Sequence, residues 1–428
     1  MNYPRLLLIS PHSFNNITGT GITFSNLFKG WSIEKIVSIH NDVVPVLDNV
    51  CKNDYYLKNE IKYIFPFNFF LRKYEIKQRK LYSVKNKRCI NIAFKTIVKK
   101  ILFGNSFIPD KFQPTAELIR YLDKYIPDVI YTTLGPNSIM ELVKWVKKRY
   151  SCKLVVHIMD DWYSANFKTG IFALYQRKRM KKLYHFNVSS ADLRLSICDE
   201  MSNAYNKRFG VDFIPFHNAI DTKKNINFID INKKNNGSKV ILRYIGSVLP
   251  YAQSESLADI AKAVDLLANK INICLELYVP NIYIEYAKQL LSFSKHTFIY
   301  PEISDDKEFY KTISTASILL LPSNFDKKSI DYIRYSMPTK VPAYMLSKTP
   351  ILVYGPEQVA QVKYAADYEW GYSISEKSVS KLVNAIKRIV SDEKLRKRIT
   401  DNAFNAVVQR HDIETVSFEF QKRICSLF

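Results

Sequence analysis

The sequence feature that most constrains the fold is a repeated alternation of short apolar runs with amphipathic stretches. Five such runs lie in the first half of the chain, at 5–11, 35–40, 127–133, 153–159 and 193–197. Strands that are apolar on both faces must be covered on both faces, which is typical of a parallel sheet between two layers of helices. The pattern therefore predicts an α/β fold with a doubly wound parallel sheet.

The same alternation begins again after Asn218. A polar stretch at 221–238 contains few positions that could enter a core, so we expect a linker there. Beyond it, apolar runs again alternate with helical patterns, and 428 residues suit two domains of about 200 residues each. Folds of this kind bind ligands beyond the carboxyl ends of their strands, which predicts a ligand cleft between the two domains. The runs lie at 240–247, 272–279, 316–322 and 350–354.

The chain carries 63 Lys and Arg against 40 Asp and Glu, a net charge of +23, and this charge is unevenly distributed. Residues 1–217 carry +17, to which 72–100 contribute +10 and 177–182 contribute +5. Apolar and aromatic side chains are interleaved with the charges of 72–100, as in elements that bind an anionic membrane surface. A solvated helical face is the alternative. Nucleic-acid binding is less favoured because no RNP, KH, helix-turn-helix or zinc signature is present.

Targeting and metal-binding signals are not evident in the sequence. The most apolar stretch, 64–71, is far shorter than the ~20 residues that a membrane-spanning helix needs, and the first apolar run is too short for a signal peptide. None of the six cysteines forms a CxxC pair or a cluster with histidine at zinc-finger spacing. We therefore expect a cytoplasmic chain without a transmembrane segment and without a metal site.

The loop after the first apolar run carries Gly19, Thr20 and Gly21, directly before a predicted helix. Glycine lets the backbone approach a ligand closely, and the amides at a helix N-terminus favour negative charge. The third glycine of a dinucleotide fingerprint is missing, because Phe24 stands in its place. These three residues are candidates for contact with a phosphate, and an ordinary surface loop is the alternative.

Two adjacent acids, Asp160 and Asp161, follow the run at 153–159, and Trp162 comes directly after them. The carboxyl ends of parallel strands face the ligand cleft. Carboxylates at that place could hold sugar hydroxyls or stabilise an oxocarbenium-like transition state. We therefore take Asp160 and Asp161 as candidate catalytic residues. The alternative is a helix N-cap beside a surface acid.

A third candidate site lies near the end of the chain, where Ser336, Thr339 and Lys340 surround Pro338. A helix that begins at Pro338 or Thr339 would present free backbone amides, and the nearby hydroxyls and ammonium group would add donors and one positive charge. Such a set of donors can hold a diphosphate. The alternative is a helix start with an exposed lysine.

The order of these segments resembles that of a known family. The loop up to Trp31, the pattern of Cys198, Met201 and Tyr205, the HNAID turn at 217–221, the YIGS strand end at 244–247 and the segment PTKVPAYMLSKTPILVYGP at 338–356 follow one another. Together they resemble the GT-B glycosyltransferases, specifically the family-4-like retaining enzymes of bacterial surface-polysaccharide synthesis. The resemblance covers nearly the whole chain.

This resemblance implies two Rossmann-like domains that face each other across a cleft. Residues 1–217 would bind the acceptor, 218–410 would bind the nucleotide sugar, and 411–428 would form a helix that crosses back to the first domain. It also implies transfer with retention, without a metal or other cofactor, from a nucleotide-sugar donor to a lipid-linked saccharide. Such an enzyme works at the inner face of the cell membrane, against the anionic lipid surface.

The resemblance also suggests roles for single residues. Gly19–Gly21 would approach the donor phosphates or the reacting sugar, and Asp160 stands where the family often has His or Asp. Gly246 and Ser247 would lie near the diphosphate. Opposite them would lie Ser336, Thr339 and Lys340.

The sequence departs from the family at the two glutamates of the E-x7-E pattern, which would fall at Tyr335 and Ala343. Contact with the ribose would then come from other groups, such as Asp326, Asp331 or Tyr344. The missing acids favour a second hypothesis, a catalytically impaired protein of this fold that acts as a binding or partner subunit. A nucleic-acid-binding protein is the third hypothesis, and net charge alone motivates it.

Overall fold

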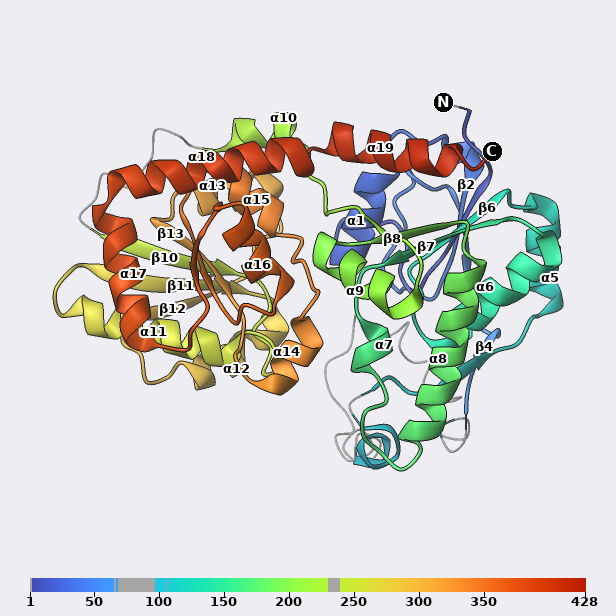
Figure 1. The fold of residues 1–428 in the computed structure, drawn as a ribbon, viewed down its shortest axis with the longest axis horizontal. Helices are drawn as coiled ribbons and strands as arrows, with labels where there is room; N and C mark the ends of the chain where they lie inside the picture. The colour runs from blue at the N-terminus through green and yellow to red at the C-terminus, as the bar shows by residue number, and fades with distance from the viewer. Residues whose placement is uncertain (1, 65–66, 68–96, 105, 230–238) are drawn as a thin grey trace. The chain divides into compact units, whose positions relative to one another are not determined.

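The structure is a computed structural model that describes residues 2–64, 67, 97–104, 106–229 and 239–428 (Figure 1). The chain divides into two compact units. The first consists of Met1–Phe216 and Glu419–Phe428, and the second of His217–Phe418. The last helix, α19 (Ile413–Cys425), therefore begins in the second unit and ends in the first.

The first unit contains a seven-stranded sheet in the order β3-β2-β1-β6-β7-β8-β9, in which all neighbouring strands are parallel. Its central strands are fully buried, as in β1, because their residues are apolar on both faces. The predicted doubly wound α/β sheet is thus confirmed. The strands are β1 (Leu6–Ile9), β2 (Ile36–His40), β3 (Asn53–Tyr56), β6 (Val129–Thr132), β7 (Lys153–Ile158), β8 (Leu193–Ser196) and β9 (Ile214–Pro215).

Helices cover both faces of this sheet, because its crossovers leave the central strands in opposite directions and such crossovers are right-handed as a rule. On one face α6 and α8 pack against each other. On the other face α1 meets the end of α19, where the ring centroids of Phe28 and Phe420 are 5.1 Å apart. The elements are α1 (Gly19–Leu27), the 3-10 helix η1 (Ile33–Lys35), α5 (Ala116–Tyr125), α6 (Asn137–Tyr150), α7 (Trp162–Ala165), α8 (Ala173–Ser190) and α9 (Asp199–Phe209).

A short antiparallel pair, β4 (Ile61–Tyr63) and β5 (Asp110–Phe112), was not predicted from the sequence. Buried Asp110 ties β5 to the start of α6, because its two carboxylate oxygens accept hydrogen bonds from the Ser138 amide (2.9 Å) and the Ser138 hydroxyl (2.6 Å). Desolvation by this burial raises the pKa of Asp110 to about 6. The pair is therefore held against the start of α6.

The two basic segments have different outcomes. Residues 177–182 lie on α8, whereas 72–96 of the predicted membrane-binding segment lie outside the described residues. Within the described part of the chain, no helix combines the length and the apolar character needed to cross a bilayer.

The second unit contains a six-stranded parallel sheet in the order β12-β11-β10-β13-β14-β15. Its core is formed by side chains of the central strands together with α11 and α17. The restart of the pattern after Asn218 thus corresponds to a second doubly wound unit. The strands are β10 (Val240–Ile245), β11 (Ile273–Val279), β12 (Thr297–Pro301), β13 (Ile318–Pro322), β14 (Ile351–Tyr354) and β15 (Tyr372–Ile374).

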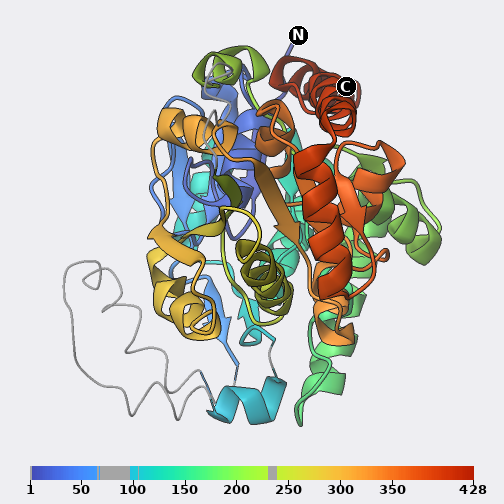
Figure 2. The same cartoon turned by 90° about the vertical axis from the view of Figure 1, so that its left-hand side faces the viewer.

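Helices lie on both sides of this second sheet (Figure 2), where α11 packs against α17 and α15 packs against α18. Besides α19, they are α11 (Ser254–Ala268), η4 (Asn281–Tyr283), α12 (Ile284–Leu290), α13 (Asp306–Ser314), α14 (Lys327–Ile333), α15 (Val341–Leu346), α16 (Ala360–Asp367), α17 (Val379–Ser391) and α18 (Glu393–Arg410).

The predicted linker at 221–238 is wrong in its first part. Asp221 caps α10 (Thr222–Asn225) by accepting a hydrogen bond from the Lys224 amide at 2.9 Å, and the 3-10 helix η2 (Ile226–Phe228) follows. Buried Asn225 donates a hydrogen bond to the Tyr310 hydroxyl at 2.8 Å. This polar segment folds onto α13 through side-chain hydrogen bonds, which a search for apolar residues does not detect. Residues 230–238 lie outside the described residues.

Candidate functional site

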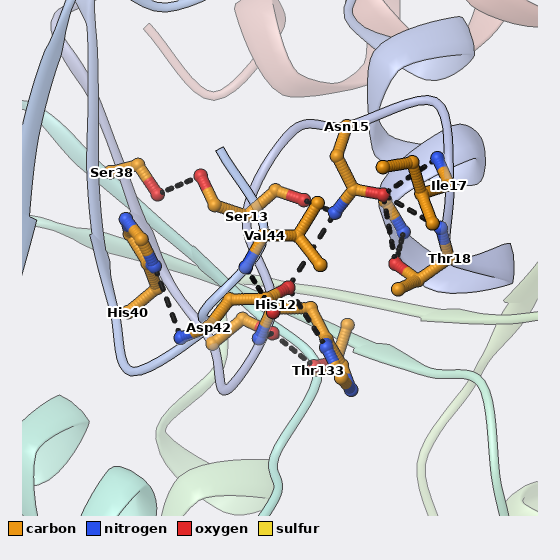
Figure 3. A network of polar contacts seen from close by, with 12 residues as sticks. His12, Ser13, Asn15, Ile17, Thr18, Ser38, His40, Asp42, Val44 and Thr133 are labelled. Atoms are coloured by element: carbon orange, nitrogen blue, oxygen red, sulfur yellow. Dashed lines mark hydrogen bonds and ion pairs between the residues drawn. The ribbon is translucent and has the colours of Figure 1, made fainter. Parts of the chain in front are cut away.

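The loop between β1 and α1 is organised by the amide of Asn15, which is 1% exposed (Figure 3). Its Oδ1 atom accepts hydrogen bonds from the amides of Ile17 (3.0 Å) and Thr18 (2.7 Å) and from the Thr18 hydroxyl (3.0 Å). Its Nδ2 atom donates to the carbonyl of Ser13 at 3.1 Å. A single buried side chain therefore fixes the shape of the loop and the entry into α1.

All three glycine-loop candidates lie at the N-terminus of α1. Gly19 and Thr20 are its first two residues, whose amides have no acceptor within the helix, and Gly19 is exposed. The Gly21 amide donates to the hydroxyl of Thr18, the N-cap residue, at 3.2 Å. A Cβ atom on Gly21 would lie only 2.2 Å from Nδ2 of Asn15, so glycine is needed for the loop and helix to pack.

His12 and Asp42 follow the ends of the neighbouring strands β1 and β2. The His12 Nδ1 atom lies 3.1 Å from Oδ2 of Asp42, and Nδ2 of Asn15 lies 3.5 Å from the same oxygen (Figure 3). The Val44 amide donates to Oδ1 of Asp42 at 3.2 Å. The histidine is thus part of the same polar network as the glycine loop. The sequence analysis gave no role to His12 or Asp42. The signal that could have revealed them is that each follows an apolar run that forms a strand.

Asp160 follows β7 at the carboxyl edge of the sheet and is exposed. Desolvation by the surrounding protein still raises the pKa of Asp160, while the Trp162 side chain and the charge of His12 act in the opposite direction. Asp160, which was predicted as a site residue, and His12, which was not, are therefore close enough to interact electrostatically. A carboxyl group with a raised pKa at a ligand-binding edge can hold a hydroxyl or exchange a proton.

Asp161 has a different environment from its neighbour. It caps α7 by accepting a hydrogen bond from the Ser164 amide at 3.3 Å, and its Oδ1 atom also accepts from the Tyr205 hydroxyl (2.7 Å) and from Arg208 (3.0 Å). Its side chain is 8% exposed. Of the two adjacent acids, Asp160 is the exposed residue, whereas Asp161 has the helix-cap environment that was the alternative for this pair.

A second candidate site lies in the second unit, where β10 ends. Gly246 follows this strand with a φ of +140°, a backbone conformation that residues with a side chain rarely adopt. The Lys340 side chain reaches this turn, since its Nζ atom donates to the Ile245 carbonyl at 2.7 Å and lies 3.9 Å from the centre of the Tyr244 ring. A Cβ atom on Gly246 would lie 2.9 Å from Nζ. The glycine thus leaves room for the ammonium group.

Desolvation lowers the pKa of Lys340 to about 7. Within the described part of the chain, no carboxylate forms an ion pair with this ammonium group, and the hydrogen-bond acceptor that it meets there is the backbone carbonyl of Ile245. An ammonium group has three protons to donate, and partial burial makes unmet donors costly. The site is therefore suited to an anion with several oxygen acceptors.

Two other predicted residues support this lysine. Tyr344 is fully buried, and its hydroxyl accepts a hydrogen bond from the Ile245 amide at 3.0 Å. The carbonyl of Ser247 accepts from the Tyr244 hydroxyl at 2.6 Å, which places Ser247 at the same turn. The structure therefore brings Gly246, Ser247, Lys340 and Tyr344 together around the end of β10.

The segment before α15 differs from the expectation. The helix begins at Val341 with Lys340 as its N-cap residue, so the predicted start at Pro338 or Thr339 was wrong. Thr339 is exposed and Ser336 is half-buried. Among the hydrogen bonds of the described residues, none joins either side chain to Lys340. Their predicted contact with a diphosphate stays a prediction.

The alternative ribose contacts occupy several environments. Asp326 caps α14 by accepting from the Ser329 amide at 3.0 Å, and Asp331 lies 3.7 Å from Arg334. Ala343, at the second E-x7-E position, is buried within α15.

No metal site is evident in the described part of the chain, because it contains no group of three His, Cys, Asp or Glu side chains that could hold an ion.

Solved structures share this architecture over nearly the whole chain. The UDP-forming α,α-trehalose-phosphate synthase from Burkholderia vietnamiensis aligns with a TM-score of 0.64 at 9% identity and covers 99% of each chain. HepE of Anabaena, in complex with UDP and glucose, aligns with a TM-score of 0.59 at 11% identity over 99% of this chain and 100% of its own. A glycosyltransferase from Rickettsia africae gives 0.59 at 12% identity and covers 99% of each chain.

The chain has the GT-B glycosyltransferase fold. This confirms the fold that the sequence resemblance implied, whereas the family-4 and surface-polysaccharide assignments stay predictions. No protein-family model and no curated protein matches the sequence. In this GT-B chain, each unit carries its candidate site at the carboxyl edge of its own parallel sheet, where α/β folds bind ligands.

We predict that Gly21→Ala lowers the free energy of unfolding. This is the opposite of what helix propensity alone predicts, because alanine stabilises a helix by about 1 kcal/mol relative to glycine. The new methyl group would displace Asn15 and break the hydrogen bonds of the loop, for a net loss of about 2 kcal/mol in denaturant titrations. In an Asn15→Ala background the obstructing amide is absent, and the same change should be neutral or stabilising. An equal loss in both backgrounds would contradict this account.

Proposed function

We propose that the chain transfers a sugar from a nucleotide-sugar donor to a saccharide acceptor. The observation that carries this proposal is Lys340, a partly desolvated cation beside Gly246 at the end of β10, with no carboxylate partner among the described residues. A diphosphate would supply the acceptors that this ammonium group lacks. HepE has been solved with UDP and with UDP-glucose, which makes uridine nucleotides the first donors to test.

In this proposal the second unit binds the donor. Lys340 would contact the diphosphate, the φ of Gly246 would allow the backbone to approach it, and Tyr344 would hold the end of β10 in place. Negative charge grows on the diphosphate as its bond to the sugar breaks. A fixed positive charge at that point stabilises the transition state more than the ground state. Ser247, Ser336 and Thr339 would complete the donor contacts.

The first unit would then act on the acceptor and the reacting sugar. Asp160, which lies in the electrostatic field of His12, is an exposed acid at the carboxyl edge of its sheet, and Gly19–Gly21 form a helix N-terminus at the same edge, where the amides of Gly19 and Thr20 have no acceptor within the helix. Asp161 would position this edge through Tyr205 and Arg208. We propose transfer with retention and without a metal ion, in which Lys340 and the helix amides supply the positive electrostatic environment.

We further propose that the acceptor is lipid-linked and that the enzyme works peripherally at the inner face of a bacterial membrane, in surface-polysaccharide synthesis. Ile171 and Leu174 are 70% and 77% exposed at the start of α8, directly before the cations of 177–182. The Ile171 amide donates to the carbonyl of Ile101 at 3.0 Å, and Ile101 is itself 54% exposed. Exposed aliphatic side chains beside cations are typical of an interfacial element.

Lys340→Ala should weaken binding of UDP-glucose. Charge-assisted hydrogen bonds contribute about 1.5–3 kcal/mol, which corresponds to a loss of affinity of about 10- to 100-fold in calorimetric titrations. Lys288→Ala, an exposed lysine on α12 of the same unit, is the matched control and should bind the donor normally. Unchanged donor affinity in Lys340→Ala would remove the central support of the proposal.

Asp160→Asn should lower kcat by about 100-fold and leave the affinity for UDP-glucose unchanged, because it removes a charge that acts on the reacting groups. Asp212→Asn, which changes another exposed carboxylate of the first unit, serves as the control. Hydrolysis of the donor by the purified chain provides the assay when the acceptor is unknown. Donor binding without transfer or hydrolysis in the natural chain would instead support the impaired binding-subunit hypothesis.

The double change Ile171→Glu and Leu174→Glu should reduce co-sedimentation with vesicles that contain phosphatidylglycerol by at least about 10-fold. Each apolar side chain buried in a membrane contributes about 1.5–3 kcal/mol, and each added carboxylate is repelled by the anionic surface. Ile282→Glu, at a position 80% exposed in the second unit, should have little effect. Equal vesicle binding by all three proteins would leave the membrane proposal without support.

A further inference from the structure

A cavity of about 740 Å³ lies on the first unit between α6, α8 and the β4–β5 pair. We call it the α6–α8 groove. Its helices cover the face of the sheet opposite α1, so it is separate from the glycine loop and from His12. The donor and catalytic roles proposed above do not use this groove, although Arg179 of its lining belongs to the basic stretch 177–182.

The groove is strongly basic. Four of its lining residues are cations, contributed by three elements: Lys111 on β5, Lys144 and Lys148 on α6, and Arg179 on α8. The acid in the lining, Glu141, accepts hydrogen bonds from Arg179 (2.7 Å) and from the Phe112 amide (2.9 Å). These contacts hold the three walls together and neutralise Arg179. The three lysines have no carboxylate partner in the part of the chain that the structure describes, so the groove favours an anion.

Aromatic rings form another part of the lining. The centroids of Phe112 and Trp145 lie 5.7 Å apart, and Tyr175, at the start of α8, is 66% exposed. Aromatic rings offer flat apolar faces, and tyrosine and tryptophan add a polar atom at the edge. The C–H faces of sugar rings pack against such surfaces, and neighbouring polar groups fix their hydroxyls.

Gln176 gives an independent indication of the ligand. Its side chain lines the groove, it is 1% exposed, and its Oε1 atom has no hydrogen-bond partner among the described residues. A buried acceptor without a donor costs about 1–3 kcal/mol. A carboxylate or a fully ionised phosphate has only acceptors and cannot satisfy this oxygen, whereas a hydroxyl group can donate to it. We therefore expect a ligand that carries both hydroxyl donors and negative charge.

We propose that the α6–α8 groove binds an acidic saccharide, a sugar chain that carries carboxylate or phosphate groups. The hydroxyls would satisfy Gln176, the acid groups would meet the lysines, and the ring faces would pack on Trp145 and Tyr175. Its identity as a distal part of the transferase's own saccharide acceptor rests on the proposed function. The binding itself depends only on the residues of the groove.

The first test is titration of the full-length protein with hexagalacturonate, an acidic hexasaccharide, and with neutral maltohexaose. Hexagalacturonate should bind at least about 10-fold more tightly, and added salt should weaken it because the charges are partly exposed. The double change Lys144→Gln and Lys148→Gln should lower this affinity by at least about 10-fold. The control Lys178→Gln and Lys182→Gln has the same spacing and charge change on α8, outside the groove lining, and should bind normally.

Gln176→Leu is the second test, because it removes the unpaired acceptor with little change in volume. Its Tm should be unchanged or higher, since a buried polar group is lost, while affinity for hexagalacturonate should fall by about 5-fold or more. A residue that merely fills space would leave the affinity unchanged. The variant thus separates binding from folding.

Several results would overturn the inference. These are equal affinity for the two hexasaccharides, an equal loss in the control pair, unchanged affinity in Gln176→Leu, or tighter binding of single-stranded DNA or anionic vesicles that depends on Lys144 and Lys148. Titration with UDP-glucose is a separate measurement on the natural protein. UDP-glucose binding without hexagalacturonate binding would overturn this inference alone, whereas the reverse result would exclude UDP-glucose as the donor of the proposed function and leave this inference standing.

Discussion

Two adjacent parallel strands cannot be joined by a tight turn, so each connection must cross back over the sheet, and here every such connection except the one from β2 to β3 does so through a helix. This constraint places helices on both faces of both sheets and leaves every β-to-α loop at the carboxyl edge. Asn15, Asp160 and Gly246 all follow strands at such edges. The candidate chemistry of both units is thus a consequence of strand direction.

The fold could largely be predicted because most central strands are nearly continuous apolar runs, as in β1 and β13, which are buried throughout. Edge strands lack that signal. β3 and β12 are mostly exposed, so their composition resembles that of loops, and neither was predicted. The segment at 222–228 was taken for a linker because it folds through caps and a buried amide hydrogen bond instead of an apolar stripe.

The candidate sites could be predicted only in part. Glycines before a helix and acids after a strand were visible in the sequence, whereas the contact of Lys340 with Ile245 joins residues 95 positions apart. Asn15, His12 and Asp42 were not assigned because each is a single polar residue in a loop. Gln176 looks like an ordinary helix residue, and only its burial without a partner shows that it differs from its neighbours.

The central claim is that Lys340 binds the diphosphate of a nucleotide sugar, and proton linkage tests it most directly. In the free protein the pKa of Lys340 is about 7, and a bound diphosphate raises it, so binding above pH 7 must take up a proton. Calorimetric titration of UDP-glucose at pH 8, in buffers of different ionisation enthalpy, should show uptake of up to about 0.9 proton. Lys340→Arg, which stays charged, should show none. Binding without proton uptake, or equal uptake in Lys340→Arg, would contradict the claim.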